Sequence, residues 1–115
     1  MAKISVILPY YETAQKIEQS LKSLESQTFQ DWELILFDER WQTSDYGKPL
    51  PAGFIGSSKV KSFVRAHRNA AALINDGIEQ ATGEFVLVLP PDIYPDPELF
   101  AAYLSKFAEE NAIAW

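Results

Sequence analysis

Continuous apolar runs mark the places where this chain is expected to form buried strands. The runs cover Ile4–Leu8, Trp32–Phe37 and Glu84–Leu89, and Val60–Val64 is a shorter run of the same kind. Apolar residues in an unbroken row, rather than alternating with polar ones, are typical of parallel strands covered on both faces. Residues 112–115 look like the beginning of one more strand.

Between the strands, apolar residues recur at helical spacing and predict three helices. The first helix follows Thr13, a suitable N-cap, and the third follows Asp96 and Pro97, which suit an N-cap and a first helical turn. The residues expected to face inward are Ile17, Leu21 and Leu24 in the first helix and Phe100, Tyr103, Leu104 and Phe107 in the third.

The middle helix is predicted over Arg68–Ala81. Gly83 lies just beyond it, where a glycine often closes a helix as a C-cap. The stripe expected to face the sheet consists of Ala70, Ile74, Ile78 and Ala81.

Strands that alternate with helices predict an α/β fold. The order is β-α-β-loop-β-α-β-α-β, an open, mostly parallel sheet with helices on both faces, in a single domain over residues 1–115. The loop over residues 40–58 is rich in Pro and Gly, and we expect it to be the most mobile part of the chain. Such sheets bind ligands beyond the carboxyl ends of their strands. That rim would consist of Pro9–Glu12, Asp38–Trp41, residues 65–69 and Pro90–Asp92.

The composition of the chain excludes several kinds of functional site. The chain has 115 residues, 47% of them hydrophobic, and no cysteine, so disulfides and cysteine nucleophiles are excluded. His67 is the only histidine, so a zinc site is not expected, and neither the phosphate-binding P-loop nor the dinucleotide-binding glycine motif is present. No apolar run approaches the ~20 residues of a membrane span, and the N-terminus does not resemble a signal peptide. We therefore expect a cytoplasmic protein without a membrane span.

The net charge of −6 argues against nucleic acid as a partner. Between Tyr46 and Asn75, however, there is no acidic residue. This stretch could face an anionic ligand such as a diphosphate, with Arg65 as the candidate contact. The alternative, an ordinary solvated loop and edge strand, is the more common role of a charge run. The basic residues are Lys48, Lys59, Lys61, Arg65 and Arg68, with His67 among them.

The predicted rim carries side chains suited to a nucleotide. Tyr10 and Tyr11 could stack on a base, although packing at the edge of the core is the simpler role for either. Asp38 or Glu39 could accept a hydrogen bond from a base imide or a ribose hydroxyl, while capping of loop amides is at least as common. Asp92 is a natural ligand for Mg²⁺ or Mn²⁺, or else a turn cap, and one carboxylate alone makes a weak metal site.

Five stretches of the sequence form a recognisable series. They are Pro9–Glu12 after the first strand, Leu24–Phe29 at the end of the first helix, the acidic pair Asp38-Glu39, the stretch Asn75–Phe85, and Leu89–Asp92. In order and spacing they resemble the family 2 glycosyltransferases of the GT-A fold. The stretch Asn75–Phe85 is similar to the family's N-x-G-I-x-x-A-x-G-E-aromatic motif, and Leu89–Asp92 stands where its Asp-x-Asp metal motif belongs. The resemblance covers essentially the whole chain and implies the Rossmann-like, N-terminal half of a GT-A domain.

By this resemblance the chain would bind a nucleotide-diphosphate sugar, of which a uridine-linked sugar is one candidate. Pro9 and Tyr11 would line the base site, and Asp38 or Glu39 would hold the base or the ribose. Asp92 would hold Mg²⁺ or Mn²⁺ weakly.

The sequence departs from the family pattern at positions that face the ligand. Pro90 replaces the first Asp of the metal motif, and Arg40-Trp41 replaces a Gly-Ser pair. Ile74 stands in place of an arginine, and Glu12 in place of an asparagine. Positions that build the scaffold are kept. We therefore expect donor binding to be weakened.

The acceptor half of the fold, with the catalytic base of inverting members, lies beyond the region that the resemblance covers. No catalytic residue is therefore assigned. The chain is expected to be part of a longer protein or a natural half-domain. The alternatives for its partners are a second copy of the chain and the rest of a longer protein. The leading interpretation is the nucleotide-sugar-binding part of a glycosyltransferase, weakly active or inactive by itself. The alternative is a non-catalytic GT-A-like module that binds a partner or a glycan. A flavodoxin-like binding domain would explain the strand order but not the stretch Asn75–Phe85.

Overall fold

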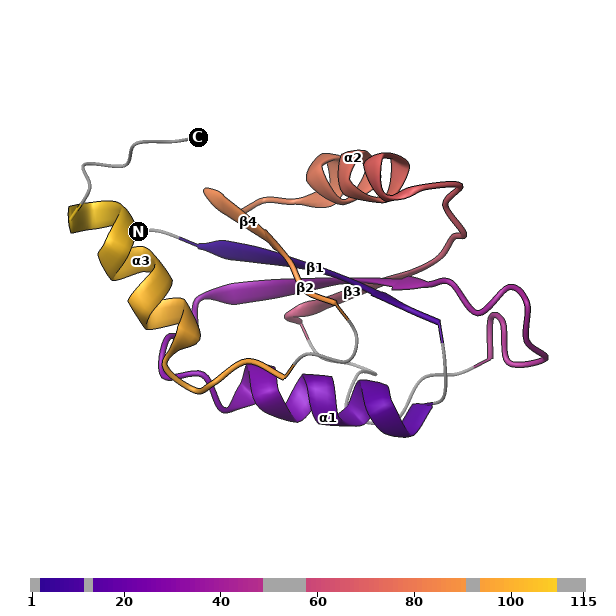
Figure 1. Ribbon diagram of the computed structural model, residues 1–115, viewed down its shortest axis with the longest axis horizontal. Helices are drawn as coiled ribbons and strands as arrows, with labels where there is room; N and C mark the ends of the chain where they lie inside the picture. The colour runs from indigo at the N-terminus through magenta and orange to yellow at the C-terminus, as the bar shows by residue number, and fades with distance from the viewer. Residues whose placement is uncertain (1–2, 12–13, 49–57, 91–93, 110–115) are drawn as a thin grey trace.

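The computed structural model describes residues 3–11, 14–48, 58–90 and 94–109, which form one parallel sheet with helices on both faces (Figure 1). The sheet order is β3-β2-β1-β4, and each pair of neighbouring strands is parallel. The predicted α/β fold and its four internal strands are confirmed. The strands are β1 (Ile4–Tyr10), β2 (Trp32–Asp38), β3 (Val60–Val64) and β4 (Phe85–Val88), and the helices are α1 (Ala14–Glu25), α2 (Ala70–Gln80) and α3 (Leu99–Glu109).

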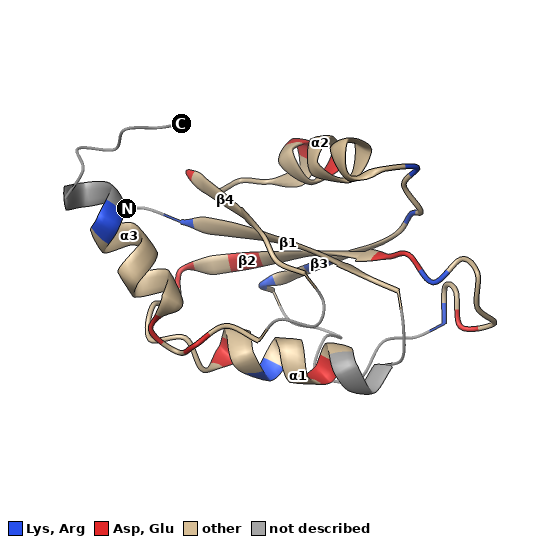
Figure 2. Cartoon of the chain, in the orientation of Figure 1, with Lys and Arg blue, Asp and Glu red and all other residues tan. Residues whose placement is uncertain are grey.

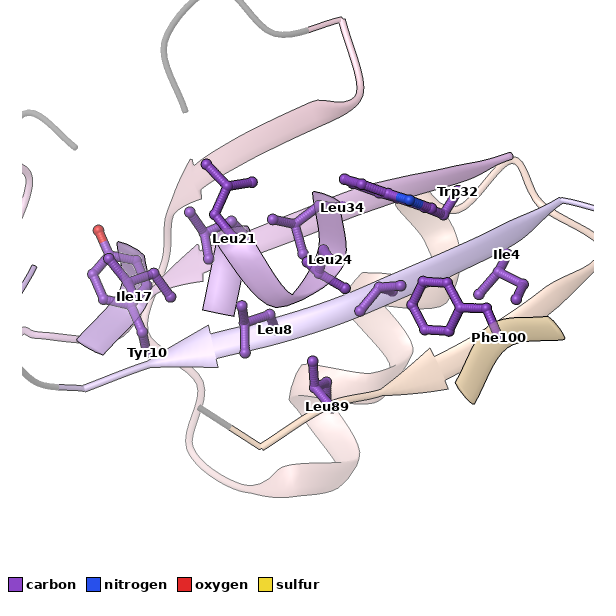
Figure 3. Packing of buried hydrophobic residues seen from close by; sticks show 12 residues of the cluster. Ile4, Leu8, Tyr10, Ile17, Leu21, Leu24, Trp32, Leu34, Leu89 and Phe100 are labelled. Atoms are coloured by element: carbon purple, nitrogen blue, oxygen red, sulfur yellow. The ribbon is translucent and has the colours of Figure 1, made fainter. Parts of the chain in front are cut away.

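The two central strands separate two hydrophobic clusters. Every residue of β1 and β2 is buried, as their continuous apolar sequences predicted. Alternate residues point to opposite faces of a strand, so each strand contributes to both clusters. The larger cluster lies beneath α1 and α3 (Figure 3), and its members include Ile4, Val6, Leu8, Leu34 and Leu36 of the sheet with Ile17, Leu21, Leu24 and Phe100 of the helices. Ile17, Leu21, Leu24 and Phe100 were predicted to face inward, and Tyr103 and Leu104 also pack against this cluster.

A buried glutamine joins α1 to α3. Gln27 donates from Nε2 to the Asp96 carbonyl (2.7 Å), and its Oε1 accepts from the Phe100 amide (3.1 Å). Asp96 also accepts from the Glu98 amide through Oδ1 (3.0 Å), but α3 begins at Leu99, so Asp96 caps the turn before the helix and is not its N-cap as predicted. Gln27 and Thr28, which follow α1, therefore fix the start of α3 through contacts with residues about 70 positions later.

The helix α2 covers the opposite face, but with a different stripe from the one predicted. Its buried residues are Leu73 and Gly77, whereas Ile78 is 51% exposed. The helix begins at Ala70, with Asn69 as its N-cap accepting from the Ala72 amide at 2.8 Å. The predicted stripe was right for Ala81, which packs against the cluster on this face, but wrong for Ile78, because the close contact with the sheet is made at a glycine.

Gly83 does not act as a helix C-cap, which corrects the prediction. The C-cap of α2 is Ala81, in an extended conformation. A Cβ at Gly83 would lie 2.6 Å from the Lys3 carbonyl oxygen and 2.7 Å from Ser5 Oγ. This glycine is therefore required where the chain passes close to the beginning of β1.

The first strand continues through Pro9, although a proline was expected to stop it at Leu8. The Tyr10 carbonyl faces β2, where it accepts from the Glu39 amide, and the Ile7 carbonyl faces β4, where it accepts from the Leu89 amide. Pro9, between them, faces the β4 side, where β1 and β4 are paired only as far as Ile7. Without an N–H group Pro9 cannot donate the next bond on that side, and the pairing of β1 with β4 ends there, while the pairing with β2 continues to Tyr10.

Several predictions concern residues outside the described part. These are the N-cap at Thr13, the inward side chain of Phe107, the strand over residues 112–115 and, within the loop over residues 40–58, residues 49–57. The beginning of that loop is described, and it is turned back by bonds from the Thr43 amide to the Arg40 carbonyl and from the Lys48 amide to the Asp45 carbonyl. Among the described helices, none has the length and apolar character needed to cross a membrane.

Candidate functional site

The carboxyl ends of the strands meet at one edge of the sheet, as predicted. The Glu39 amide donates to the Tyr10 carbonyl at 2.9 Å, so the chain leaving β2 runs beside the end of β1. Figure 2 shows the acidic end of β2 followed at once by a basic residue. These residues are Asp38, Glu39 and Arg40, and all three are buried.

Asp38 accepts four hydrogen bonds from its own chain. Oδ1 accepts from the Arg40 amide and from Arg40 Nε, both at 3.0 Å. Oδ2 accepts from Arg40 Nη2 at 3.1 Å and from the Gly47 amide at 2.8 Å. Burial alone would raise the pKa of Asp38, but the hydrogen bonds from Arg40 and Gly47 hold it below its usual value. Gly47 has a φ of 78°, a conformation that suits glycine.

Arg40 is held from two further sides. Its guanidinium lies over the ring of Tyr10, 4.7 Å from the centroid, and Nη2 donates to the Lys48 carbonyl at 3.3 Å. The hydrogen bonds to Asp38 raise the pKa of Arg40 above its usual value, although burial acts in the other direction. The pKa of Tyr10 is raised to about 12, first by burial and then by the Asp38 charge. Tyr10, Asp38 and Arg40 thus form a buried cluster of contacting side chains at the edge of the sheet.

Glu39 contacts His67, in the segment after β3, and His67 in turn contacts Asp76 of α2. Glu39 accepts from the His67 amide at 2.8 Å, and its Oε2 lies 2.7 Å from His67 Nδ1. On the other side of the ring, His67 Nε2 lies 2.8 Å from Asp76 Oδ2, and Arg65 Nη1 donates to Asp76 Oδ1 at 2.7 Å. A ring with a carboxylate at each nitrogen suits the doubly protonated imidazolium, since both nitrogens then donate. Burial alone would lower the pKa of His67, but the hydrogen bonds to Asp76 and Glu39 raise it above its usual value.

A pocket of about 280 Å³ lies beside Glu39 and Arg40. Two aromatic side chains in its lining reach solvent, Tyr11 at 50% exposure and Trp41 at 57%. Burial and the Glu39 charge raise the pKa of the Tyr11 phenol, so Tyr11 stays neutral at physiological pH. The pocket is lined by Tyr11, Glu39, Arg40, Trp41, Gln42 and Thr43.

The structure brings together some of the residues that the sequence singled out. Tyr11 and Glu39 line the pocket, while Pro9 and Asp38 are buried and are not part of its lining. Asp92 lies outside the described residues. Within the described residues, no group of three or more His, Cys, Asp or Glu side chains could hold a metal ion.

The stretch between Tyr46 and Asn75 is not a free positive patch in the part that the structure describes. Three of its cations contact carboxylates: Lys48 with Asp45 at 3.4 Å, Lys61 with Glu33 at 3.0 Å, and Arg65 with Asp76 at 2.7 Å. Two of these partners, Asp45 and Asp76, stand directly before and after the acid-free stretch, and Glu33 comes from β2.

The sequence did not reveal the residues that hold the acidic pair in place. Arg40 and Trp41 were placed on the rim and noted as departures from a pattern but were given no role, although an arginine directly after two acidic residues is a signal for a local ion pair. Asp76 and Gly47 gave no signal by themselves, because their contacts depend on how α2 and the loop after β2 fold back.

An open parallel sheet with helices on both faces and a pocket at its carboxyl edge belongs to the doubly wound α/β class. The sequence profile of Glycosyl transferase family 2 matches residues 5–115, and this chain belongs to that family. A curated relative, the GalNAc(5)-diNAcBac-PP-undecaprenol beta-1,3-glucosyltransferase of Campylobacter jejuni, is 30% identical over 113 residues. The match covers 96% of this chain and 35% of that protein.

Solved structures agree with this assignment. The fold matches residues 1–349 of Staphylococcus aureus TarS with a TM-score of 0.68 at 27% identity, covering 95% of this chain and 33% of that one. It also matches the mannosyltransferase PcManGT of Pyrobaculum calidifontis, solved with GDP-Man and Mn²⁺, with a TM-score of 0.75. The latter match covers 93% of this chain and 32% of that one, and at 22% identity it bears on the fold alone. The chain thus spans about a third of the length of these relatives.

Proposed function

We propose that this chain is the nucleotide-sugar-binding part of a glycosyltransferase, with the base in the pocket beside Tyr11 and Trp41. The observation that carries the proposal is an aromatic-lined pocket at the carboxyl edge of β1 and β2 in a family 2 fold. Aromatic rings stack on any base, and each stacking contact is worth about 1–3 kcal/mol.

A related structure supports the class of ligand. Staphylococcus aureus TarS has been solved in complex with UDP-GlcNAc, and that structure matches this chain at 26% identity, with a TM-score of 0.69 over 95% of the chain. We infer that a uridine-linked sugar is the first ligand to test. Since the chain spans a third of such relatives, sugar transfer by the whole protein is part of the proposal.

The remaining assignments follow from position and charge. We propose that Pro9 shapes the floor of the base site and that Arg65, whose side chain is 45% exposed, attracts the diphosphate. Asp92 is the candidate ligand for Mg²⁺ or Mn²⁺. The neighbouring Pro90 has no side-chain ligand, so we propose that the metal is held weakly and that this part of the protein has little or no transfer activity by itself.

The proposal is tested by titrating UDP and UDP-GlcNAc into the ¹⁵N-labelled chain and following backbone amide and tryptophan indole signals by NMR. We expect the Trp41 indole and the amides of Tyr11 and Thr43 to shift. Tyr11→Ala and Trp41→Ala should each weaken binding about tenfold or more, as stacking contacts predict. Tyr46→Ala is the matched control, since Tyr46 is an exposed aromatic residue of the same loop outside the pocket lining. Absence of binding, or shifts confined to other surfaces, would refute the proposal.

A second candidate is a non-catalytic GT-A-like module that binds a partner or a glycan. The burial of Asp38 under Arg40 favours it, because this carboxylate is not open to a nucleotide. In that case a glycan without a nucleotide would shift the same signals, whereas UDP would not.

A further inference from the structure

His67 belongs to a network of charged side chains that reaches from the pocket to α2. Glu39 lines the pocket, and its Oε2 lies 2.7 Å from His67 Nδ1. On the far side of the ring, Nε2 lies 2.8 Å from Oδ2 of Asp76, and Arg65 donates to the other oxygen of Asp76 at 2.7 Å. The imidazole ring is therefore the link between a carboxylate of the pocket and a carboxylate of the helix.

The middle of this network is closed to solvent. The side chains of Glu39 and His67 are 3% and 9% exposed, and the ring of His67 stands edge-on to Phe37 of β2 with centroids 4.7 Å apart. Arg65, at the outer end, is partly exposed. Because water reaches the ring poorly, a change in the charge of His67 is screened less than it would be on the surface.

The net charge of the network depends on one proton. While His67 carries a proton on each nitrogen, two carboxylates face two cations and the charges balance. A neutral ring leaves one negative charge in excess, and one of its nitrogens then faces a carboxylate with no hydrogen to donate. Burial alone would lower the pKa of His67, but the hydrogen bonds to Asp76 and Glu39 raise it. Loss of the proton thus adds a negative charge beside the pocket.

The other charged or titratable groups near the pocket keep their charge around neutral pH. Arg40 lines the pocket and Arg68 follows His67 on the exposed side, and arginine side chains remain protonated in proteins. Burial and the Glu39 charge raise the pKa of the Tyr11 phenol, which stays neutral. Histidine is the side chain that ordinarily changes charge in this range. His67 is therefore the group of this network through which pH can act.

We propose that His67 is a charge switch for the pocket, so that an anionic ligand binds tightly while His67 is protonated and more weakly once the ring is neutral. The inference rests on the proposed function, which supplies an anionic ligand. Above the His67 midpoint the attraction that Arg65 offers to a diphosphate is offset by carboxylates that the ring no longer compensates. Coupling between two binding events is reciprocal, so the bound ligand should in turn raise the pKa of His67.

The experiment measures the dissociation constant of UDP-GlcNAc by NMR titration at pH values on both sides of the His67 midpoint. Both phosphates of this ligand are esterified, so its charge stays constant, whereas the terminal phosphate of free UDP would titrate. Since His67 is the only histidine, its ring protons report the midpoint with and without ligand. We expect affinity to fall about threefold or more above the midpoint. Saturating ligand should raise the midpoint by about half a pH unit, the same coupling seen from the other side.

Uridine and His67→Gln separate the charge of His67 from other effects of pH. Uridine has the same base and ribose but no charge below the pH at which its imide ionises, and its affinity should be equal on both sides of the midpoint. His67→Gln keeps every other titratable group, the N-terminal amine included, and should bind UDP-GlcNAc without this pH dependence.

Three results would overturn the inference and leave the proposed function standing. They are an unchanged UDP-GlcNAc affinity across the His67 midpoint, an equal weakening of uridine, and the same pH dependence in a folded His67→Gln chain. If UDP-GlcNAc binds the natural chain at no pH, the proposed function fails and the inference fails with it.

Asp76→Asn provides a second test at a residue outside the pocket lining. It removes one of the two carboxylates that favour the protonated ring, so the His67 midpoint should fall, and the pH at which UDP-GlcNAc affinity decreases should fall with it. Glu79→Gln, at an exposed carboxylate of the same helix, is the control and should change neither value. Urea unfolding first shows that each variant is folded. A His67 midpoint that moves without a matching change in the binding curve would contradict the role given to His67.

Discussion

Gly77 of α2 lies directly against Ile7 of β1. A Cβ atom on Gly77 would fall 2.7 Å from Ile7 Cγ1 and still closer to Ile7 Cδ1. Ile7 is fully buried and β-branched, so it has little freedom to move aside. The glycine in the stretch Asn75–Phe85 therefore sets the distance between helix and sheet, and with it the position of Asp76 beside His67.

Gly77→Ala is expected to destabilise the chain. In an exposed helix position the same change would add about 1 kcal/mol of stability, but here overpacking should cost about 1–3 kcal/mol. Urea unfolding measures the difference, and Asn75→Ala, at an exposed position of the same helix, is the control that should be neutral or slightly stabilising. A more stable Gly77→Ala chain would show that α2 does not pack as closely as described.

The other end of the sheet is held by a buried carboxylate. Glu33 accepts from Ser5 Oγ at 2.6 Å and from the amide and hydroxyl of Thr82 at 2.6 and 2.9 Å, and it pairs with Lys61 at 3.0 Å. Burial alone would raise the pKa of Glu33, but these hydrogen bonds lower it from its usual 4.5 to about 2. One side chain thus joins β1, β2, β3 and the segment after α2.

The stability of the chain should therefore fall in acid through Glu33. Because the pKa is lower in the folded state, the stabilisation is present above pH 4.5 and is lost as the pH falls toward 2. The shift corresponds to about 3 kcal/mol at neutral pH. Glu33→Gln should lose about that much at pH 7 and show a weaker pH dependence below 4.5, by urea unfolding at several pH values. Glu79→Gln, at an exposed carboxylate, is the control, and equal acid sensitivity of Glu33→Gln and the natural chain would contradict the assignment.

The sheet could be predicted from the sequence because its signal is local. A row such as Trp32–Phe37, apolar except for Glu33, indicates burial on both faces, and β2 is buried throughout. The register of α2 could not be predicted in the same way. Ile74 and Ile78 look like the inner stripe, but Leu73 and Gly77 are inside, because a small residue allows the closest approach.

The site was only partly predictable for a related reason. Its carboxylates follow a strand, and that position was correctly expected to reach the rim. Their partners come from elsewhere: His67 is 28 residues after Glu39, and Asp76 is 9 residues after His67. These contacts depend on how α2 packs on the sheet, so they cannot be predicted from the spacing of residues in the sequence. The contact of Arg40 with Asp38 could have been predicted, because the two residues are only two positions apart.

His67 is expected to titrate above its usual pKa of 6.5. Both ring nitrogens face carboxylates, so the protonated form is favoured in the folded chain. Its stabilisation is fully present below pH 6.5 and is lost as the pH rises through the folded-state pKa. As the only histidine, its ring protons give a single NMR titration curve. His67→Gln should remove the corresponding decrease in stability between neutral and alkaline pH, while a midpoint at or below 6.5 would contradict the described contacts.

The last prediction concerns the metal. We expect the natural chain to bind UDP weakly and with little dependence on Mn²⁺. A hard cation takes six or more oxygen ligands, and Asp92 is the one carboxylate of the motif that the sequence keeps. Pro90 is exposed at the end of β4, beyond the buried Leu89, so a side chain placed there can reach the rim without entering the core.

Pro90→Asp should make UDP binding depend on Mn²⁺, because two carboxylates and the diphosphate then share the coordination of the ion. Calorimetric titration of UDP with and without Mn²⁺ measures this, and we expect Mn²⁺ to tighten binding to the variant about tenfold or more while changing the natural chain only slightly. Pro90→Ala is the matched control, since it removes the proline without adding a ligand. Tight and strictly Mn²⁺-dependent binding by the natural chain would mean that another group replaces the missing aspartate, and the proposal of a weakly held metal would then be wrong.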